Sequence, residues 1–133
     1  MGLFPGKRPN DLGVRNGRLK APPATPNAVH SQVTEGYHAI APLRYTGPRD
    51  AAMRKLVEIV RAAPRTLIVT QTSDYLYVEY GSPLMGFVDD VEFWFPPEDG
   101  VVHVRSASRL GSSDLGVNRK RVEQIRAQLA GET

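Results

Sequence analysis

The alternation of apolar and polar residues between positions 89 and 109 limits the fold of this chain more than any other feature of its sequence. Apolar side chains occupy every second position on either side of a short Pro- and Gly-containing segment: Val91, Phe93, Phe95, Val102 and Val104. Side chains alternate between the two faces of a β-strand, so these five share one buried face only in an antiparallel hairpin. The hairpin must pair Phe93 with Val104 and use residues 97–100 as its turn.

The same register gathers charged side chains on the opposite face. It places Glu92 opposite Arg105, whereas a slip by one residue would put Arg105 among the phenylalanines. Asp89 and Asp90 are adjacent in the strand and point to opposite faces, so without a bulge they cannot share a metal ion or act as paired carboxylates. We therefore predict a structural polar cluster that comprises Asp89, Asp90, Glu92, Arg105 and Asp114.

Helical and alternating periodicities extend over most of residues 48–133. They predict helices over 48–63 and 118–130, and strands over 66–71, 75–80, 89–95 and 101–109. The fold class is α+β, with a mainly antiparallel four-stranded sheet and two helices on one face. We expect a single domain over residues 1–133, with an α-β-β-β-β-α core in 48–133.

The first 47 residues contain about half of the glycines and prolines of the chain. Pro22, Pro23 and Pro26 prevent a continuous helix in this segment. Apolar residues nevertheless recur in it, namely Leu12, Val14, Leu19, Val29, Tyr37, Ile40, Leu43 and Tyr45. A free tail would leave these side chains in water, so we predict that residues 1–47 form an extended strap packed on the domain.

The charge of the chain is modest and unevenly distributed. The formal net charge is +3, and both ends are basic around an acidic middle. Internal charge pairing explains this pattern more simply than a polyanionic partner, and no nucleic-acid-binding module is recognisable. No apolar run reaches the ~18–20 residues of a membrane span. The N-terminal residues lack the apolar core of a signal peptide, so we expect a cytoplasmic protein.

The residues that usually hold metals and cofactors are sparse. The chain has no cysteine, which excludes disulfides, thiolate metal sites and a Cys nucleophile. His30, His38 and His103 lack metal-ligand spacing. Neither a phosphate-binding glycine motif nor a nucleophile elbow occurs. We expect no metal and no cofactor.

Three consecutive cations at 119–121 form the most unusual local feature. If Asn118 caps the second helix, these cations occupy its first turn, where the helix dipole disfavours each by ~0.3–1 kcal/mol. An anion bound at the helix N-terminus would offset that cost. Neutralisation by nearby carboxylates, or a helix that starts at Asp114, is the alternative. The candidate anion site comprises Arg109, Ser112, Ser113, Asn118, Arg119 and Arg121.

The short polar side chains between 109 and 118 also suit a structural role. The chain reverses direction here between a strand and a helix, which leaves backbone N–H groups without partners. Such groups are often satisfied by short polar side chains. We predict that Asp114 accepts hydrogen bonds from backbone amides or an arginine, and that Asn118 bonds the main chain.

The segment 81–88 is unusually apolar for a loop. It contains Leu84, Met85, Phe87 and Val88, while Pro83 and two glycines keep it out of regular structure. The segment either plugs one end of the core or forms a tip that binds a partner.

Several short motifs recur along the chain in a specific combination. They are LGV at 12–14, GRL at 17–19, PN at 26–27 followed by SQ at 31–32, IAPL at 40–43, GFVDDVEF at 86–93, VRSASRLG at 104–111 and SDLGVNRKR at 113–121. This combination covers nearly the whole chain and resembles the domain-of-unknown-function family 1499. The resemblance implies a compact bacterial or plastid domain without an established activity, so no catalytic residue is carried over.

The sequence departs from that family at one point. Many members have a cysteine pair flanking the Pro-Asn motif, and Pro22 and Ala28 stand at these positions here. The resemblance then implies that packing alone holds the strap, which agrees with a cytoplasmic location.

Two functions remain open from the sequence. The first is a non-catalytic binding or scaffold domain whose partner is a small anion or a protein. The second is a small hydrolase or transferase that acts on a phosphorylated or carboxylated substrate. A pocket that holds Arg109 beside an unpaired polar side chain would favour the enzyme. Mutual pairing of the Asp, Arg and Asn side chains would favour the scaffold.

Overall fold

The computed structural model describes residues 6–83 and 86–131. Its elements are β1 (Ala28–His30), β2 (Leu43–Arg44), α1 (Arg49–Ala62), β3 (Thr66–Gln71), β4 (Tyr75–Gly81), β5 (Val88–Trp94), β6 (Val101–Ser108) and α2 (Val117–Leu129). The two helices and the four longer strands lie within one residue of the bounds that the sequence predicts. In the described part of the chain, neither helix is long and apolar enough to span a membrane.

The sheet has six antiparallel strands rather than the predicted four. The order is β1-β6-β5-β4-β3, and β2 also pairs with β6. The two additional strands come from the strap, and they have three and two residues. Elements this short show no alternation in a sequence, which is why the prediction was wrong in number.

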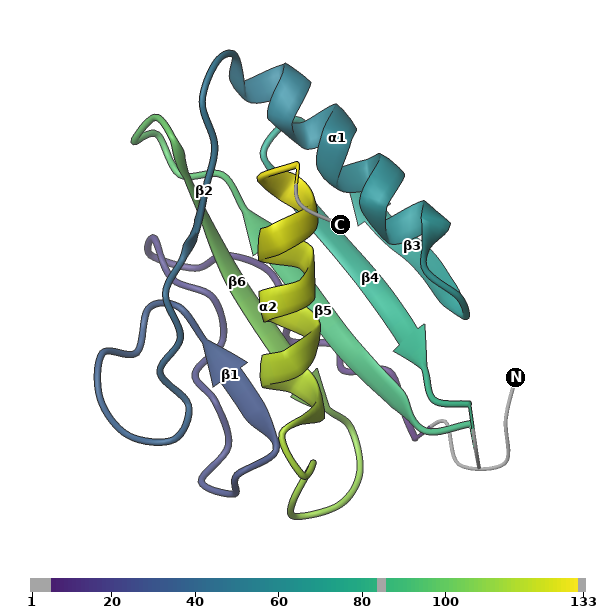
Figure 1. Cartoon of the computed structure of the whole chain (residues 1–133). Helices are drawn as coiled ribbons and strands as arrows, with labels where there is room; N and C mark the ends of the chain where they lie inside the picture. The colour runs from purple at the N-terminus through teal and green to yellow at the C-terminus, as the bar shows by residue number, and fades with distance from the viewer. Residues whose placement is uncertain (1–5, 84–85, 132–133) are drawn as a thin grey trace.

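The predicted register of the hairpin is confirmed. Phe93 pairs with Val104, and Glu92 pairs with Arg105. Phe93 and Val104 are fully buried against the helices, which cover one face of the sheet (Figure 1). The charged pair lies on the other face, which the strap crosses.

The core lies between the sheet and the two helices. Helix α1 contributes Met53, Leu56 and Val60, and α2 contributes Val122, Ile125 and Leu129. These residues recur three or four positions apart, so each helix turns one stripe toward the sheet.

The strap packs on the rest of the fold. Leu19, Val29, Ile40 and Leu43 are buried, and Val29 and Leu43 belong to strands that pair with β6. Tyr37 is an exception to the prediction, since 41% of its surface is exposed.

The apolar loop at 81–88 is only partly described, because Leu84 and Met85 lie outside the described residues. Val88 begins β5 and is buried, whereas Phe87 is 42% exposed.

Candidate functional site

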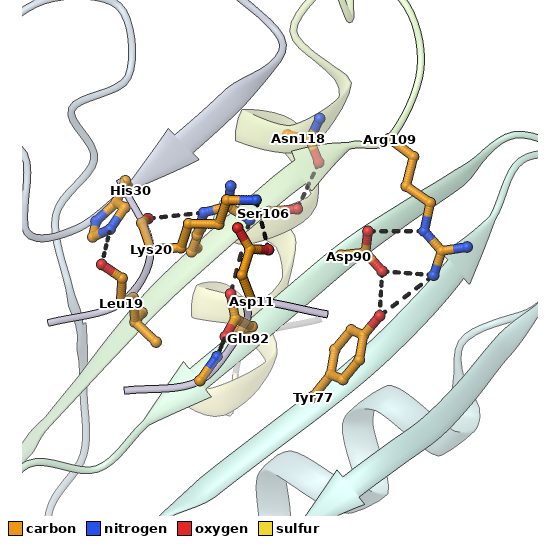
Figure 2. Close-up of polar contacts among 12 residues, drawn as sticks. Asp11, Leu19, Lys20, His30, Tyr77, Asp90, Glu92, Ser106, Arg109 and Asn118 are labelled. Carbon is orange, nitrogen blue, oxygen red and sulfur yellow. Dashed lines mark hydrogen bonds and ion pairs between the residues drawn. The ribbon is translucent and has the colours of Figure 1, made fainter. Parts of the chain in front are cut away.

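Alternation along β4, β5 and β6 gathers polar side chains on the face of the sheet away from the helices. We call this set the charged layer, and it comprises Tyr75, Tyr77, Glu79, Asp90, Glu92, Arg105, Arg109 and, from the strap, Arg8. Strap residues such as Asp11, Leu19 and Lys20 lie over part of it (Figure 2). The layer is therefore enclosed between the sheet and the strap.

Arg109 is paired on several sides within this layer. Its Nε and Nη2 donate to the two oxygens of Asp90 at 2.9 and 2.8 Å, and Nη2 also donates to Glu79 (Figure 2 shows the Asp90 contacts). Tyr77 donates its hydroxyl to Asp90. Burial alone would lower the pKa of Arg109, but these hydrogen bonds outweigh burial and raise it. Arg109 is thus held in its charged form by the fold itself.

Arg8 extends the same network into the strap. Its Nε and Nη2 donate to Glu79 at 2.6 and 3.0 Å. The hydrogen bond from Arg8 is the main reason that the pKa of Glu79 is lowered. One carboxylate therefore joins the strap to Arg109.

Glu92 and Arg105 form a second, looser pair. Both are buried, and Arg105 Nη1 lies 3.8 Å from Glu92 Oε1, an oxygen that accepts no hydrogen bond from any described residue. Burial raises the pKa of the Glu92 carboxyl and lowers the pKa of the Arg105 guanidinium. The other oxygen of Glu92 accepts hydrogen bonds from Tyr75 at 2.6 Å and from the backbone N–H of Gly13 at 2.8 Å.

The strap is shaped to complete this pair. Gly13 has a φ of 105°, a backbone conformation that residues with a side chain disfavour. In this conformation its N–H donates to Glu92. The carbonyl of Lys20 accepts a hydrogen bond from Arg105 Nε at 3.0 Å. Basic residues from both ends of the chain thus meet carboxylates from its acidic middle, which accounts for much of the uneven charge distribution.

On the helix side of the sheet, Asp114 and Asn118 fasten the start of α2. Asp114 accepts hydrogen bonds from the backbone N–H groups of Gly116 and Asn118 at 2.9 and 3.2 Å, and from the Tyr37 hydroxyl at 2.8 Å. Burial would raise the pKa of Asp114, but the hydrogen bonds from Asn118, Gly116 and Tyr37 lower it. We call Asp114 and Asn118 the helix lock.

Asn118 connects this lock to the strap and the sheet. Its side-chain NH₂ donates to the Asn27 carbonyl at 3.2 Å, as the sequence predicts for a main-chain contact, and to Ser108 at 3.0 Å. Its oxygen accepts hydrogen bonds from Ser106 and Arg121 at 2.6 and 2.8 Å. Asn118 is not the residue that caps the helix, because α2 begins at Val117, after Gly116 in a left-handed conformation.

The three cations of the first helical turn have different surroundings. Arg121 Nη2 lies 2.7 Å from Asp89. Arg119 donates to the strap carbonyls of Ala39, at 2.9 Å, and Tyr37. Lys120 is exposed, and its side chain makes no hydrogen bond or ion pair with any described residue. Neighbouring carboxylate and carbonyl groups thus offset the unfavourable helix dipole at two of the three positions.

The structure separates the six residues of the candidate anion site. Asn118 and Arg121 contact each other, whereas Arg109 joins the charged layer on the opposite face of the sheet, and Arg119 joins the strap. Ser112 and Ser113 are exposed on the loop before α2. Proximity in sequence did not predict proximity in space, because the chain leaves the sheet between Ser108 and Val117.

An open cleft lies between the two helices and was not predicted. The helices meet where Lys55 donates to the Leu129 carbonyl at 2.9 Å, and they separate toward the start of α2 (Figure 1). The cleft has a volume of about 500 Å³, and its residues include Arg65, Tyr80 and Lys120. Its position depends on the angle between the helices, for which the sequence carries no local signal.

A smaller hollow adjoins the cleft. Its volume is about 260 Å³, and it shares Ser82, Asp89 and Val117 with the larger one. Within residues 6–83 and 86–131, no group of three or more His, Asp or Glu side chains could hold a metal ion.

Sequence reasoning also missed Glu79, Tyr75 and Tyr77 as members of the charged layer. The signal was present, because these residues alternate with the buried residues of β4. Pairing β4 with β5 in the same way as β5 with β6 would have placed them beside Asp90 and Glu92.

Comparison with known proteins gives one match. The family described as "Protein of unknown function (DUF1499)" matches residues 18–129. No curated protein and no solved structure matches the chain.

Proposed function

The chain belongs to DUF1499, a family of unknown function, and we propose on structural grounds that it is a non-catalytic binding domain. In this proposal the charged layer and the helix lock hold the strap and α2 in place. The cleft between the helices is the surface that receives a ligand.

The observation that supports this proposal is the mutual pairing of the groups best suited to acid–base chemistry. Glu79, Asp90 and Glu92 are each less than a twentieth exposed, and arginines or tyrosines contact all three. A catalytic acid or base must come within hydrogen-bond reach of its substrate. These three carboxylates make their hydrogen bonds and ion pairs with arginines and tyrosines of the protein itself.

The cleft has the character of a binding surface. Its volume falls within the ~300–1,000 Å³ range of small-molecule sites, and several of the residues that line it have aliphatic side chains. The carboxylate that lines it, Asp89, is 2.7 Å from Arg121 and is therefore already paired.

A turnover assay tests this proposal against the hydrolase alternative. The full chain is incubated with p-nitrophenyl phosphate and p-nitrophenyl butyrate, and release of nitrophenol is followed. We expect rates equal to those in buffer. Turnover that Asp89→Asn abolishes, and that the matched exposed substitution Asp74→Asn preserves, would show that the domain is catalytic.

A further inference from the structure

The helix-facing side of the sheet is polar at the end where the helices separate. The pairing of the strands places Thr66, Tyr80, Asp89 and Ser108 in one row across β3, β4, β5 and β6. The neighbouring row contains Ile68, Val78 and Val91, which pack into the core or against it, and ends on β6 at Ser106, whose hydroxyl is buried and bonds Asn118. Two members of the first row, Tyr80 and Asp89, line the cleft and supply polar groups to its floor.

Positive charge predominates among the residues that line the cleft. They include three cations, Arg65, Lys120 and Arg121, and one carboxylate, Asp89, so the difference is +2. Asp89 is paired with Arg121. Arg65 uses its Nε to donate to the Gly81 carbonyl at 3.1 Å, and the Lys120 ammonium has no polar contact among the described residues. The cleft is thus electrostatically suited to one or two negative charges.

Tyr80 adds a hydrogen-bond donor to this setting. Its hydroxyl bonds no described residue, and burial raises the pKa of the phenol to about 12, so it remains protonated near neutral pH. The guanidinium of Arg121 lies 4.7 Å from the centre of its ring. Phenol, ammonium and guanidinium groups are all donors to an oxyanion.

The remaining walls suit an aliphatic chain. Ile59, Ala62, Val117 and Ile125 line the cleft. The adjoining hollow is lined by Phe87, Leu110 and Leu115, which are 42%, 44% and 94% exposed. Exposed apolar surface of this kind, continuous with a cationic cleft, favours a ligand with an apolar body.

From these observations we propose that the cleft binds an amphiphilic anion, an aliphatic chain that ends in a carboxylate. The carboxylate lies between Lys120, Arg65 and the Tyr80 hydroxyl, and the chain extends over Val117 toward Leu115. This inference rests on the proposed function, because it names the ligand class of the same cleft.

Titration calorimetry with three ligands of equal chain length tests the inference. Octanoate, octanol and octyltrimethylammonium each have eight carbons in the chain and carry a negative, a neutral and a positive head group. The full chain is titrated with each below its aggregation concentration. We expect octanoate to bind at least roughly tenfold more tightly than the other two, the difference that one favourable ionic contact of moderate strength provides.

Variants then locate the site. Lys120→Glu should weaken octanoate binding by roughly tenfold or more, since it reverses the charge of an exposed side chain without a structural partner among the described residues. Arg44→Glu makes the same charge change on β2 outside the cleft and should leave octanoate binding unchanged. Ala62→Trp fills the cleft from an exposed helical position and should abolish binding. Equal urea midpoints for the variants and the parent would show that each is folded.

Equal binding of octanoate and octyltrimethylammonium, an absence of octanoate binding, or an unchanged affinity in Lys120→Glu would overturn the inference. Preferential binding of octanol that Ala62→Trp removes would also overturn it, but would leave the cleft as a binding site and the proposed function intact. A last experiment distinguishes a dissolved carboxylate from a lipid surface as the ligand. Sedimentation with phosphatidylglycerol-containing vesicles, without binding of octanoate, would show that the anion recognised is a bilayer and not a single amphiphile.

Discussion

At the scale of single residues, the charged side chains of this fold differ more in their partners than in their chemistry. Arg109 is buried among two carboxylates and a tyrosine, whereas Arg54 lies on the surface of α1 and pairs with the exposed Asp50. Removing one member of a buried ion pair leaves the other charge unpaired, so the cost is far larger than at the surface. Burial and pairing therefore decide which arginines matter to the fold.

Arg109→Met should reduce the free energy of unfolding by roughly 3–5 kcal/mol, because Glu79 and Asp90 lose a buried counter-charge. Urea unfolding measures this change. Arg54→Met is the matched control and should cost less than about 1 kcal/mol. An Arg109→Met protein as stable as the parent would show that the charged layer does not hold the fold.

Asp114→Ala should cost roughly 1–3 kcal/mol, because two backbone N–H groups at the start of α2 and the Tyr37 hydroxyl lose their acceptor. Ser112→Ala, in the same loop but exposed, should leave the urea midpoint unchanged. If Asp114→Ala keeps or raises the midpoint, the helix lock is wrong.

His30 should make stability depend on pH between about 6.5 and 4. The ring is buried, and burial lowers its pKa to about 4, whereas the unfolded chain takes up this proton near pH 6.5. Acidification therefore favours the unfolded state, by about 2 kcal/mol between pH 7 and pH 5. Comparison with His30→Gln isolates this effect, because Glu92, whose raised pKa acts in the opposite direction, is present in both proteins. Equal pH slopes for the two would contradict the prediction.

At the scale of elements, the sequence predicted the helices and the long strands, because their side chains repeat with a regular period. It missed the short strands, which are too short to show one. Alternation over seven or eight residues was enough to predict β5, β6 and their register. The two short strap strands carry no such signal, and they form because β6 offers them a free edge. The strap is thus a part of the sheet and the cover of the charged layer.

Removal of residues 1–24 should lower the melting temperature by roughly 10 °C or more. The truncated chain keeps β1 and β2 but loses the contacts of Arg8, Gly13 and Lys20 to Glu79, Glu92 and Arg105. The loss opens the charged layer to water and leaves each of these three groups with fewer partners. Differential scanning calorimetry measures the shift. A melting temperature equal to that of the full chain would show that the strap is dispensable for stability.

At the scale of the whole molecule, the candidate site was harder to predict than the fold. The six residues proposed for an anion site are close in sequence, yet the sheet separates Arg109 from Asn118 and Arg121. The cleft combines side chains from α1, β4 and α2, so it exists only once the helices have packed at their observed angle. Local patterns predict elements and pairings, whereas a cleft of this kind depends on tertiary arrangement.

The most direct test of the account maps ligand binding over the whole surface by amide chemical shifts. The ¹⁵N-labelled chain is titrated with a library of small fragments of mixed charge and polarity. We predict that fragments bind and that the perturbed amides gather around the cleft at Arg65, Tyr80 and Lys120, while those of the charged layer stay unchanged. Perturbations centred on Arg109 and Glu92 instead, or no perturbation by any fragment, would contradict the assignment of the charged layer to structure and of the cleft to binding.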